Sequence, residues 1–298
     1  MMALAEKVPS LQCLTNFLNV ELDKPGAATR RLAENRNYST MRNLKLILAY
    51  DGTEFSGWQV QPGLPTIQGT LASAIGRLTG ENVLPQGAGR TDAGVHARAQ
   101  VVTFATESPI PVENWEKALN GILPASIRVL SAEEAAANFH ARKSTKAKSY
   151  EYRMFRGPVC PPFAARYVWH YPYPLNERAM MAAANAVVGE HDFTSFAAVD
   201  PERVAGEEGR IGNGVEPRNN VRRIFSSEWT RQGDELIYTV RGSGFLHHMV
   251  RNLVGTYVLL GKGTIDREGF LKILAARNRS AAGPTAPASG LFQVSVEY

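Results

Sequence analysis

The chain is organised around Gly87-Ala88-Gly89-Arg90-Thr91-Asp92-Ala93-Gly94-Val95-His96-Ala97, which leads into the apolar stretch 100–104. Three glycines in eight residues require a backbone that turns sharply or approaches another group closely. The bend carries a carboxylate, Asp92, two residues after a guanidinium, Arg90. A loop between strands can present such an acid as a reactive group, or Asp92 can simply cap a neighbouring backbone amide.

The elements around this loop follow a split β-α-β order. Alternating apolar residues predict a strand from Asn43 to Tyr50, and Thr66 can cap the helix that follows. That helix carries an apolar stripe of Ile67, Leu71, Ile75 and Leu78. The remaining predicted elements are a strand near Val83, a strand at 99–105, a helix at 112–122 and a strand at 127–132. The order β-α-β-β-α-β is that of the ferredoxin-like unit.

The second half of the chain repeats this order loosely. We expect strands at 149–155, 221–230, 236–241 and 291–297, and helices at 176–188, 245–260 and 267–276. The turn Gln232-Gly233-Asp234 joins the middle two strands as a hairpin. The predicted fold class is α+β, with two ferredoxin-like (split β-α-β) lobes, a mainly antiparallel sheet and a cleft between the lobes. We place the N-terminal lobe, with the Asp92 loop, at 42–140 and the C-terminal lobe at 141–298.

Two segments differ from the rest of the chain. Residues 1–41 mix short apolar pieces with polar runs and lack the pattern of a signal peptide, so we expect either a disordered N-terminal extension or an upstream start codon chosen in error. The segment 199–220 is rich in glycine and in charges of both signs, which predicts a mobile insertion beside the cleft.

The composition is that of an ordinary globular protein: 298 residues, 44% of them hydrophobic and 20% charged. No apolar run approaches the roughly twenty residues that span a bilayer, so we expect no membrane partner. The two cysteines, Cys13 and Cys160, form neither a disulfide framework nor a zinc knuckle, which favours a reducing, cytoplasmic setting. The net charge of +5 suits a nucleic-acid partner without demanding one.

Positive charge is concentrated between residues 140 and 156. Glu151 is the single acid of this segment, and its basic residues are Arg142, Lys143, Lys146, Lys148, Arg153 and Arg156. The segment can be a strip that contacts phosphates or a solvated edge strand protected by lysines. Charge alone does not separate these two interpretations.

Three stretches resemble the motifs of one known family. The nine residues from Gly89 to Ala97 resemble, residue for residue, the active-site motif of the tRNA pseudouridine synthase A family. The second and third motifs of that family resemble the stretches Phe139-His140-Ala141-Arg142 with Lys148-Ser149-Tyr150-Glu151-Tyr152-Arg153, and Gly244-Phe245-Leu246-His247-His248-Met249-Val250-Arg251-Asn252. The resemblance covers roughly 41–298.

The resemblance implies a catalytic set of Asp92, Arg90, Tyr150 and Arg251. In it Asp92 is the catalytic carboxylate, Tyr150 lies against the target base, and Arg251 reaches Asp92 from a helix flank that it shares with His247. Arg90, in the loop, is the better candidate for holding the backbone of the flipped nucleotide. The alternation of Tyr150 and Tyr152 also fits one face of a half-buried strand, and both interpretations can hold together.

We expect substrate binding by Tyr150 and by three further residues, namely Arg142, Lys148 and His247. We expect no metal. Adjacent helical residues such as His247 and His248 point about 100° apart, and no cysteine or acid lies at ligand spacing.

The resemblance implies conversion of uridine to pseudouridine at positions 38–40 of tRNA, in the anticodon arm, by a homodimer whose two subunits both contact the tRNA. No cofactor is expected, because no group enters the product and no redox change occurs. The motifs leave open whether Asp92 attacks the sugar, attacks the base or abstracts a ribose proton. The alternatives are a non-catalytic RNA-binding module and a glycoside hydrolase, although hydrolases usually need two carboxylates and the motifs supply one.

Overall fold

The computed structural model describes residues 41–199 and 219–298. The predicted disordered extension, up to residue 40, and most of the predicted mobile insertion at 199–220 lie outside the described residues. Within the described ranges no helix is long and apolar enough to cross a membrane.

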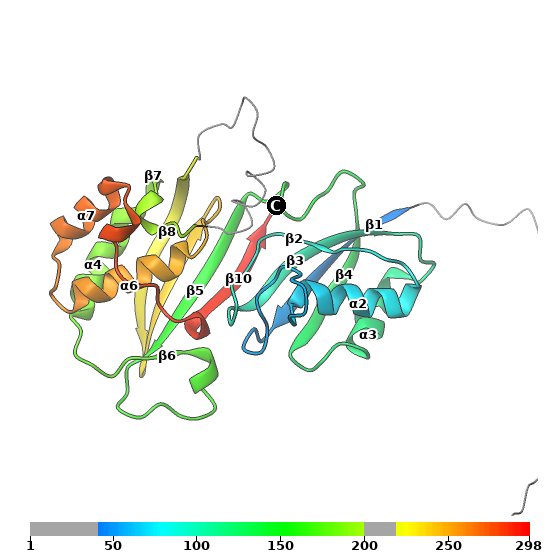
Figure 1. Ribbon diagram of the computed structural model, residues 1–298, viewed down its shortest axis with the longest axis horizontal. Coiled ribbons are helices and arrows are strands. Elements are labelled where there is room, and N and C mark those ends of the chain that lie inside the picture. Colours follow the sequence, from blue (N-terminus) through cyan, green and yellow to red (C-terminus); the bar gives the residue numbers. More distant parts are fainter. Residues whose placement is uncertain (1–40, 200–218) are drawn as a thin grey trace, which may run out of the picture. The chain divides into compact units, whose positions relative to one another are not determined.

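The first half of the chain forms strands and helices in the predicted order (Figure 1). They are β1 (Arg42–Tyr50), α2 (Ile67–Thr79), β2 (Gln86–Gly87), β3 (His96–Thr106), α3 (Val112–Asn120) and β4 (Ile127–Ala135). The predicted cap of α2 is confirmed, because the Thr66 side chain accepts a hydrogen bond from the Gly69 amide. The prediction of a strand near Val83 is wrong by a few residues, because the strand in this region is β2, which begins at Gln86 and pairs with β3.

The described part of the second half is richer in strands. Its elements are β5 (Ala147–Phe155), β6 (Trp169–His170), α4 (Glu177–Ala184), β7 (Gly189–Asp192), β8 (Val221–Gln232), β9 (Glu235–Gly242), α6 (Met249–Gly261), α7 (Arg267–Ala276) and β10 (Leu291–Glu297). Short 3₁₀ turns lie at Ala165–Tyr167, Asn185–Val187, Thr194–Phe196, Arg279–Ala281 and Ala288–Gly290. The predicted β8–β9 hairpin is confirmed, and Gly233 adopts φ 57° in its turn, a conformation that glycine accepts without strain.

Helix α6 begins four residues later than predicted. The sequence pattern predicts a helix from residue 245, whereas α6 starts at Met249, directly after His248 with φ 59° and ψ 4°. A residue in this left-handed conformation cannot continue a right-handed helix. Residues 245–248 therefore form a loop, and His247 and His248 precede the helix instead of lying on its surface.

The described strands form a ten-stranded sheet of order β4-β1-β3-β10-β5-β9-β8-β7, with β2 paired to β3 and β6 paired to β5. Strand β10 joins the two halves. It is parallel to β3, through Phe292 opposite His96 and Gln293 opposite Ala97, and antiparallel to β5. The other pairings are antiparallel except β5 with β6. The predicted α+β class and the mainly antiparallel sheet are therefore confirmed.

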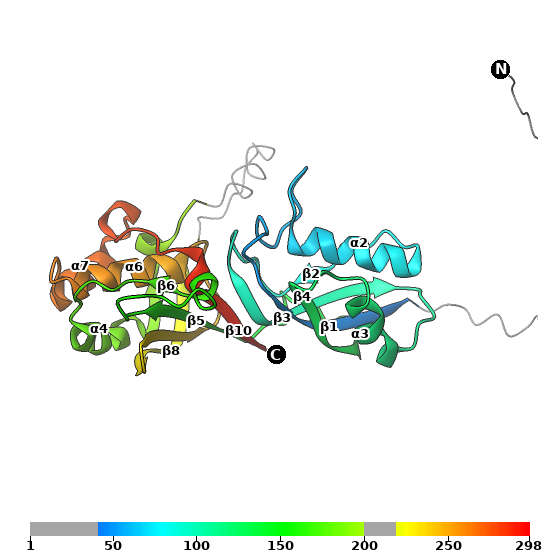
Figure 2. The same cartoon turned by 90° about the horizontal axis from the view of Figure 1, so that it is seen from below.

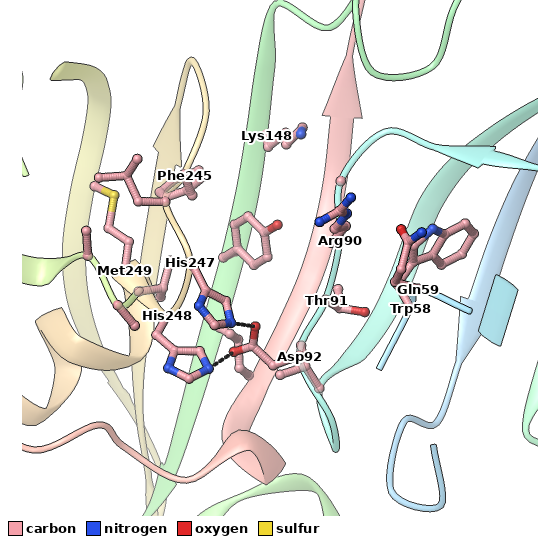
Figure 3. A pocket seen from close by; sticks show the side chains of 18 of the residues that line it. Trp58, Gln59, Arg90, Thr91, Asp92, Lys148, Phe245, His247, His248 and Met249 are labelled. Atoms are coloured by element: carbon pink, nitrogen blue, oxygen red, sulfur yellow. Dashed lines mark ion pairs between the residues drawn. The ribbon is translucent and has the colours of Figure 1, made fainter. Parts of the chain in front are cut away.

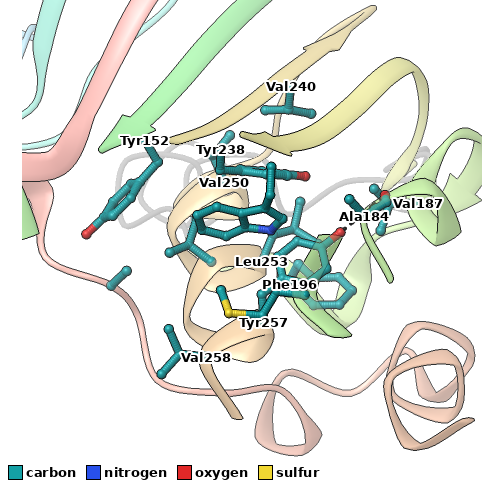
Figure 4. Close-up of a cluster of buried hydrophobic side chains, with 14 of the residues drawn as sticks. Tyr152, Ala184, Val187, Phe196, Tyr238, Val240, Val250, Leu253, Tyr257 and Val258 are labelled. Carbon is teal, nitrogen blue, oxygen red and sulfur yellow. Dashed lines mark hydrogen bonds between the residues drawn. The ribbon is translucent and has the colours of Figure 1, made fainter. Parts of the chain in front are cut away.

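The hydrophobic core consists of two large clusters, one in each half of the sheet. In Figures 1 and 2, α2 and α3 lie over one end of the sheet, and α4, α6 and α7 lie over the other. Alternate residues of β1 (Leu44, Leu46 and Leu48) are fully buried in the first cluster, where each contributes roughly 1.5–3 kcal/mol. In the second, the Tyr257 ring of α6 packs against the Tyr238 ring of β9, with ring centroids 5.3 Å apart (Figure 4). These two cores keep the helices and strands that carry the site in fixed positions.

Candidate active site

A cavity of about 830 Å³ opens where the two halves meet (Figure 3). Six of the seven predicted site residues line it, namely Arg90, Asp92, Arg142, Lys148, Tyr150 and His247. The seventh, Arg251, is hydrogen-bonded to Asp92. The structure thus brings together residues that are up to 159 positions apart in the sequence.

The backbone of the Asp92 loop is held from both sides. The Thr91 hydroxyl lies 2.8 Å from the buried Tyr50 hydroxyl, and the Thr91 carbonyl accepts a hydrogen bond from the Trp58 amide at 3.0 Å. After Asp92, Gly94 turns the chain with φ 76°, a conformation that a side chain at this position would disfavour. These contacts fix the direction in which the Asp92 side chain leaves the loop.

Asp92 forms an ion pair with Arg251. Arg251 Nη1 donates to Asp92 Oδ2 at 2.8 Å, and the two side chains are only 14% and 18% exposed respectively. Arg251 is itself oriented, because its Nε donates to the Ala286 carbonyl at 2.7 Å while the Ala286 amide donates to the Arg251 carbonyl at 3.1 Å. A guanidinium in this position stabilises the charged form of the carboxylate.

His247 and His248 both approach the same carboxylate. His247 Nε2 lies 3.6 Å from Asp92 Oδ1 and His248 Nε2 lies 3.3 Å from Asp92 Oδ2, and the ring centroids are 3.9 Å apart. The sequence argument against a metal assumed that neighbouring helical side chains diverge, and this assumption is wrong because both residues precede α6. Their nitrogens and an Asp92 oxygen lie within 4.8 Å of one another, close enough to hold a metal ion.

The environment of His248 favours its neutral form. Burial lowers the pKa of His248, the nearby Asp92 opposes this shift, and the positive charges of Arg251 and Arg279 add to it.

His247 is anchored by the segment before residue 200. The Ala198 amide donates to its carbonyl at 3.0 Å, and its Nδ1 lies 3.1 Å from the Val199 carbonyl oxygen.

Tyr150 of β5 forms an aromatic wall of the cavity. The residue is 7% exposed, and its ring meets that of Phe245 edge to face, with ring centroids 4.9 Å apart. Burial raises the pKa of Tyr150 well above its usual value, and the charge of Asp92 adds to this shift. The hydroxyl therefore stays protonated at neutral pH.

The basic segment 140–156 contributes Arg142 and Lys148 to the rim of the cavity. Lys148 Nζ donates to the Ala88 carbonyl at 2.5 Å. Burial lowers the pKa of Lys148 to about 8, and the charges of Arg142 and Arg222 contribute. The interpretation of this segment as an edge strand is wrong, because β5 pairs with β10 on one side and β9 on the other.

Several cavity residues were not singled out by the sequence analysis: Trp58, Gln59, Arg222, Phe245 and Arg279. For His248 the sequence raises only the question of metal binding, and the predicted helix argues against it. No local pattern marks Arg222 or Arg279, since each reaches the cavity through the long-range arrangement of β8 and of the 3₁₀ turn at Arg279–Ala281. Phe245 lies within the third motif, which was the available signal for it.

The fold and this site define a protein with one carboxylate between an aromatic wall and a basic rim. The family described as tRNA pseudouridine synthase matches residues 46–142 and 183–298. Curated proteins named tRNA pseudouridine synthase A are also similar. That of Solibacter usitatus is 54% identical over 87% of this chain and 100% of its own length. That of Moorella thermoacetica is 46% identical over 86% of this chain and 99% of its own length. That of Brevibacillus brevis is 44% identical over 87% of this chain and all of its own length.

The chain belongs to the tRNA pseudouridine synthase A family. Among solved structures, a chain in the crystal structure of a Cbf5-Nop10-Gar1 complex aligns with 84% of this chain and 57% of its own, at 11% identity and a TM-score of 0.32. Nothing about the site follows from a similarity at that level.

Proposed function

We propose that the protein isomerises uridine to pseudouridine at positions 38–40 in the anticodon arm of tRNA, with Asp92 as the catalytic carboxylate. One observation carries the proposal: the Asp92 carboxylate, paired with Arg251 at 2.8 Å, faces a cavity whose wall is aromatic and whose rim is basic. Membership of the family supplies the reaction class, that of an isomerase.

Each side chain has a role in this proposal that matches its chemistry. Arg251 pairs with the Asp92 carboxylate and holds it in place, so that the carboxylate can act as a nucleophile or a base. Tyr150 stacks on the flipped base, since its aromatic side chain lines the cavity. Arg90 holds the backbone of the flipped nucleotide, and the remaining rim residues, Arg142, Lys148 and His247, bind the RNA around it.

The reaction that these residues serve is balanced within the nucleotide. The bond between N1 and C1′ breaks, the freed base turns, and a bond forms between C5 and C1′. One proton leaves C5 and one is gained at N1, so that no redox partner takes part. We accordingly propose that catalysis uses no cofactor and no resident metal.

Wider features of the proposal concern the fold and the setting. The strand orders β4-β1-β3-β2 and β10-β5-β9-β8 support two ferredoxin-like lobes, at 42–140 and 141–298. We also propose that the protein forms a homodimer, an expectation that rests on the resemblance to the family. The free thiol of Cys160 is consistent with a reducing, cytoplasmic setting.

Site mapping tests the proposed substrate. Transcribed tRNAs with uridine at position 38, 39 or 40 alone are incubated with the protein, and pseudouridine is located by carbodiimide labelling and primer extension. We expect a product at these positions and none in a matched tRNA with cytidine at all three. Product confined to another arm would contradict the proposed substrate while leaving the reaction class intact.

A further inference from the structure

Asp92, His247 and His248 place one carboxylate and two imidazole nitrogens around a common point in the cavity (Figure 3). The two Nε2–Oδ distances are 3.6 Å and 3.3 Å. Two ligands about 2.0–2.1 Å from a tetrahedral zinc ion lie about 3.3–3.4 Å from each other. The two spacings, one to each oxygen of the carboxylate, lie within a few tenths of an ångström of this separation, and one donor atom from each of the three residues lies within 4.8 Å of the others.

The backbone determines which nitrogen of His247 carries a hydrogen. The Val199 carbonyl oxygen, 3.1 Å from His247 Nδ1, can only accept, so Nδ1 donates. In the neutral ring Nε2 then presents a lone pair to an oxygen of the Asp92 carboxylate. Two acceptors that face each other repel unless a cation, a proton or a metal ion, lies between them. A backbone carbonyl on the far nitrogen is also how metal-binding histidines are usually oriented.

The left-handed backbone at His248 is what lets two neighbouring residues reach one carboxylate. This conformation is disfavoured for any residue with a side chain, and such residues persist where the surrounding contacts enforce them, often at functional sites. In a regular helix the two rings would diverge. Here the left-handed conformation of His248 lets the side chains of both histidines point toward Asp92.

We propose that Asp92, His247 and His248 bind a divalent transition-metal ion such as Zn²⁺, and that the bound ion reversibly inhibits the enzyme. The inhibition rests on the proposed function, because a carboxylate that ligates a metal is withdrawn from reaction with the uridine. Two imidazoles with one carboxylate favour Zn²⁺ or Co²⁺ over Mg²⁺, which prefers oxygen ligands. Water from the cavity can complete the coordination.

The surrounding positive charge sets the strength of this binding. Arg251 donates to the Asp92 oxygen that His248 approaches, and Arg279 also lines the cavity. Both guanidinium groups repel a divalent cation at short range. The ion is therefore held more weakly than a structural zinc, and a chelator removes it.

Direct titration of the full chain, without an affinity tag, tests the site itself. Zn²⁺ binding followed by calorimetry, and Co²⁺ binding followed by visible absorption, are expected to show one ion in this cluster. His247→Gln and His248→Gln should each raise the Kd at least about tenfold. The matched control His191→Gln, which removes an imidazole outside the cavity, should leave the Kd unchanged. Absent binding, or binding that both cavity variants retain in full, would overturn the proposal.

The rate of pseudouridine formation tests the inhibition, with each protein compared to its own metal-free rate. Zn²⁺ at ten times its Kd leaves about one-eleventh of the sites free, so the wild-type rate should fall about tenfold. EDTA should restore it, and the same concentration of Mg²⁺ should have no effect. An unchanged rate with the site occupied would overturn the inhibition. A chain that is inactive before metal is added would contradict the proposed function instead, while the titration still decides the metal site.

Discussion

Two loops from opposite halves of the chain meet at Asp92, and they turn by different means. The Asp92 loop uses Gly94, with φ 76°, two residues before β3, whereas the loop before α6 uses His248, with φ 59°. Glycine accepts this conformation freely, and histidine adopts it only where contacts hold it. The first loop is therefore set by its own backbone, and the second depends on Asp92 and on the Ala198–Val199 segment.

The largest effect is expected when the link between the two loops is cut. Arg251→Gln removes the cation that faces Asp92, and kcat should fall about 10²–10³-fold. Arg251→Lys keeps the charge but loses the bond from Nε to Ala286, so an intermediate rate is expected. Single-turnover kinetics on tRNA measure both variants, and a kcat for Arg251→Gln within tenfold of wild type would contradict the role given to the ion pair.

Tyr150 tests the aromatic wall that stands beside both loops. Tyr150→Ala should weaken tRNA binding by the stacking energy of about 1–3 kcal/mol, or roughly 5- to 150-fold in Kd. Tyr150→Phe keeps the ring and should lose much less. Equal losses in the two variants would argue for the hydroxyl instead of the ring. Thermal unfolding serves as the control, since Tyr150→Ala also removes a buried side chain.

The difference between the loops is tested by exchanging their turn residues for others. Gly94→Ala should lower the free energy of unfolding by about 1–2 kcal/mol, because alanine resists φ 76° and its Cβ would lie 3.3 Å from that of Ala288. At His248, which has φ 59°, glycine should be the better replacement: the free energy of unfolding of His248→Gly should exceed that of His248→Ala by up to about 1 kcal/mol. Denaturant unfolding measures all three variants. A stability order with His248→Ala above His248→Gly would show that the backbone at this position is not strained.

The smallest effect concerns the basic rim and its dependence on pH. The pKa of Lys148 is lowered to about 8, so the ammonium is present at pH 7 and largely lost by pH 9. The KM for tRNA should rise across this range by less than about tenfold, as expected for one lost phosphate contact. Lys148→Arg stays charged and should show a flatter profile. A wild-type KM that is constant from pH 7 to pH 9 would remove Lys148 from the substrate-binding set.

Much of the fold could be predicted from local sequence, because the signals that determine it are local. Alternating leucines mark β1, a threonine caps α2, and glycine marks the β8–β9 turn. The Asp92 loop was recognisable for the same reason, since its glycines are visible in the sequence. The left-handed His248 was not, because long-range contacts and not its own residue type enforce that conformation. The late start of α6 and the convergence of the two histidines follow from this one residue.

The rim of the cavity shows the same limit. Arg142 and Lys148 were identifiable from a run of positive charge, although that pattern could not distinguish a central strand from an edge strand. The pairing of β5 with both β9 and β10 decides this, and it depends on a C-terminal strand more than 130 residues away. Arg222 and Arg279 enter the cavity through comparable long-range arrangements, which no spacing within the sequence encodes.

The most direct test of the central claim is tritium release from tRNA labelled with [5-³H]uridine, comparing wild type with Asp92→Asn. The hydrogen on C5 is lost only when the base is rejoined to the sugar through carbon. We predict release by the wild type and none by Asp92→Asn, which should still fold and bind tRNA. Release by Asp92→Asn at the wild-type rate would contradict the role of Asp92 as the catalytic carboxylate. No release by a wild-type protein that binds tRNA tightly would contradict the reaction itself.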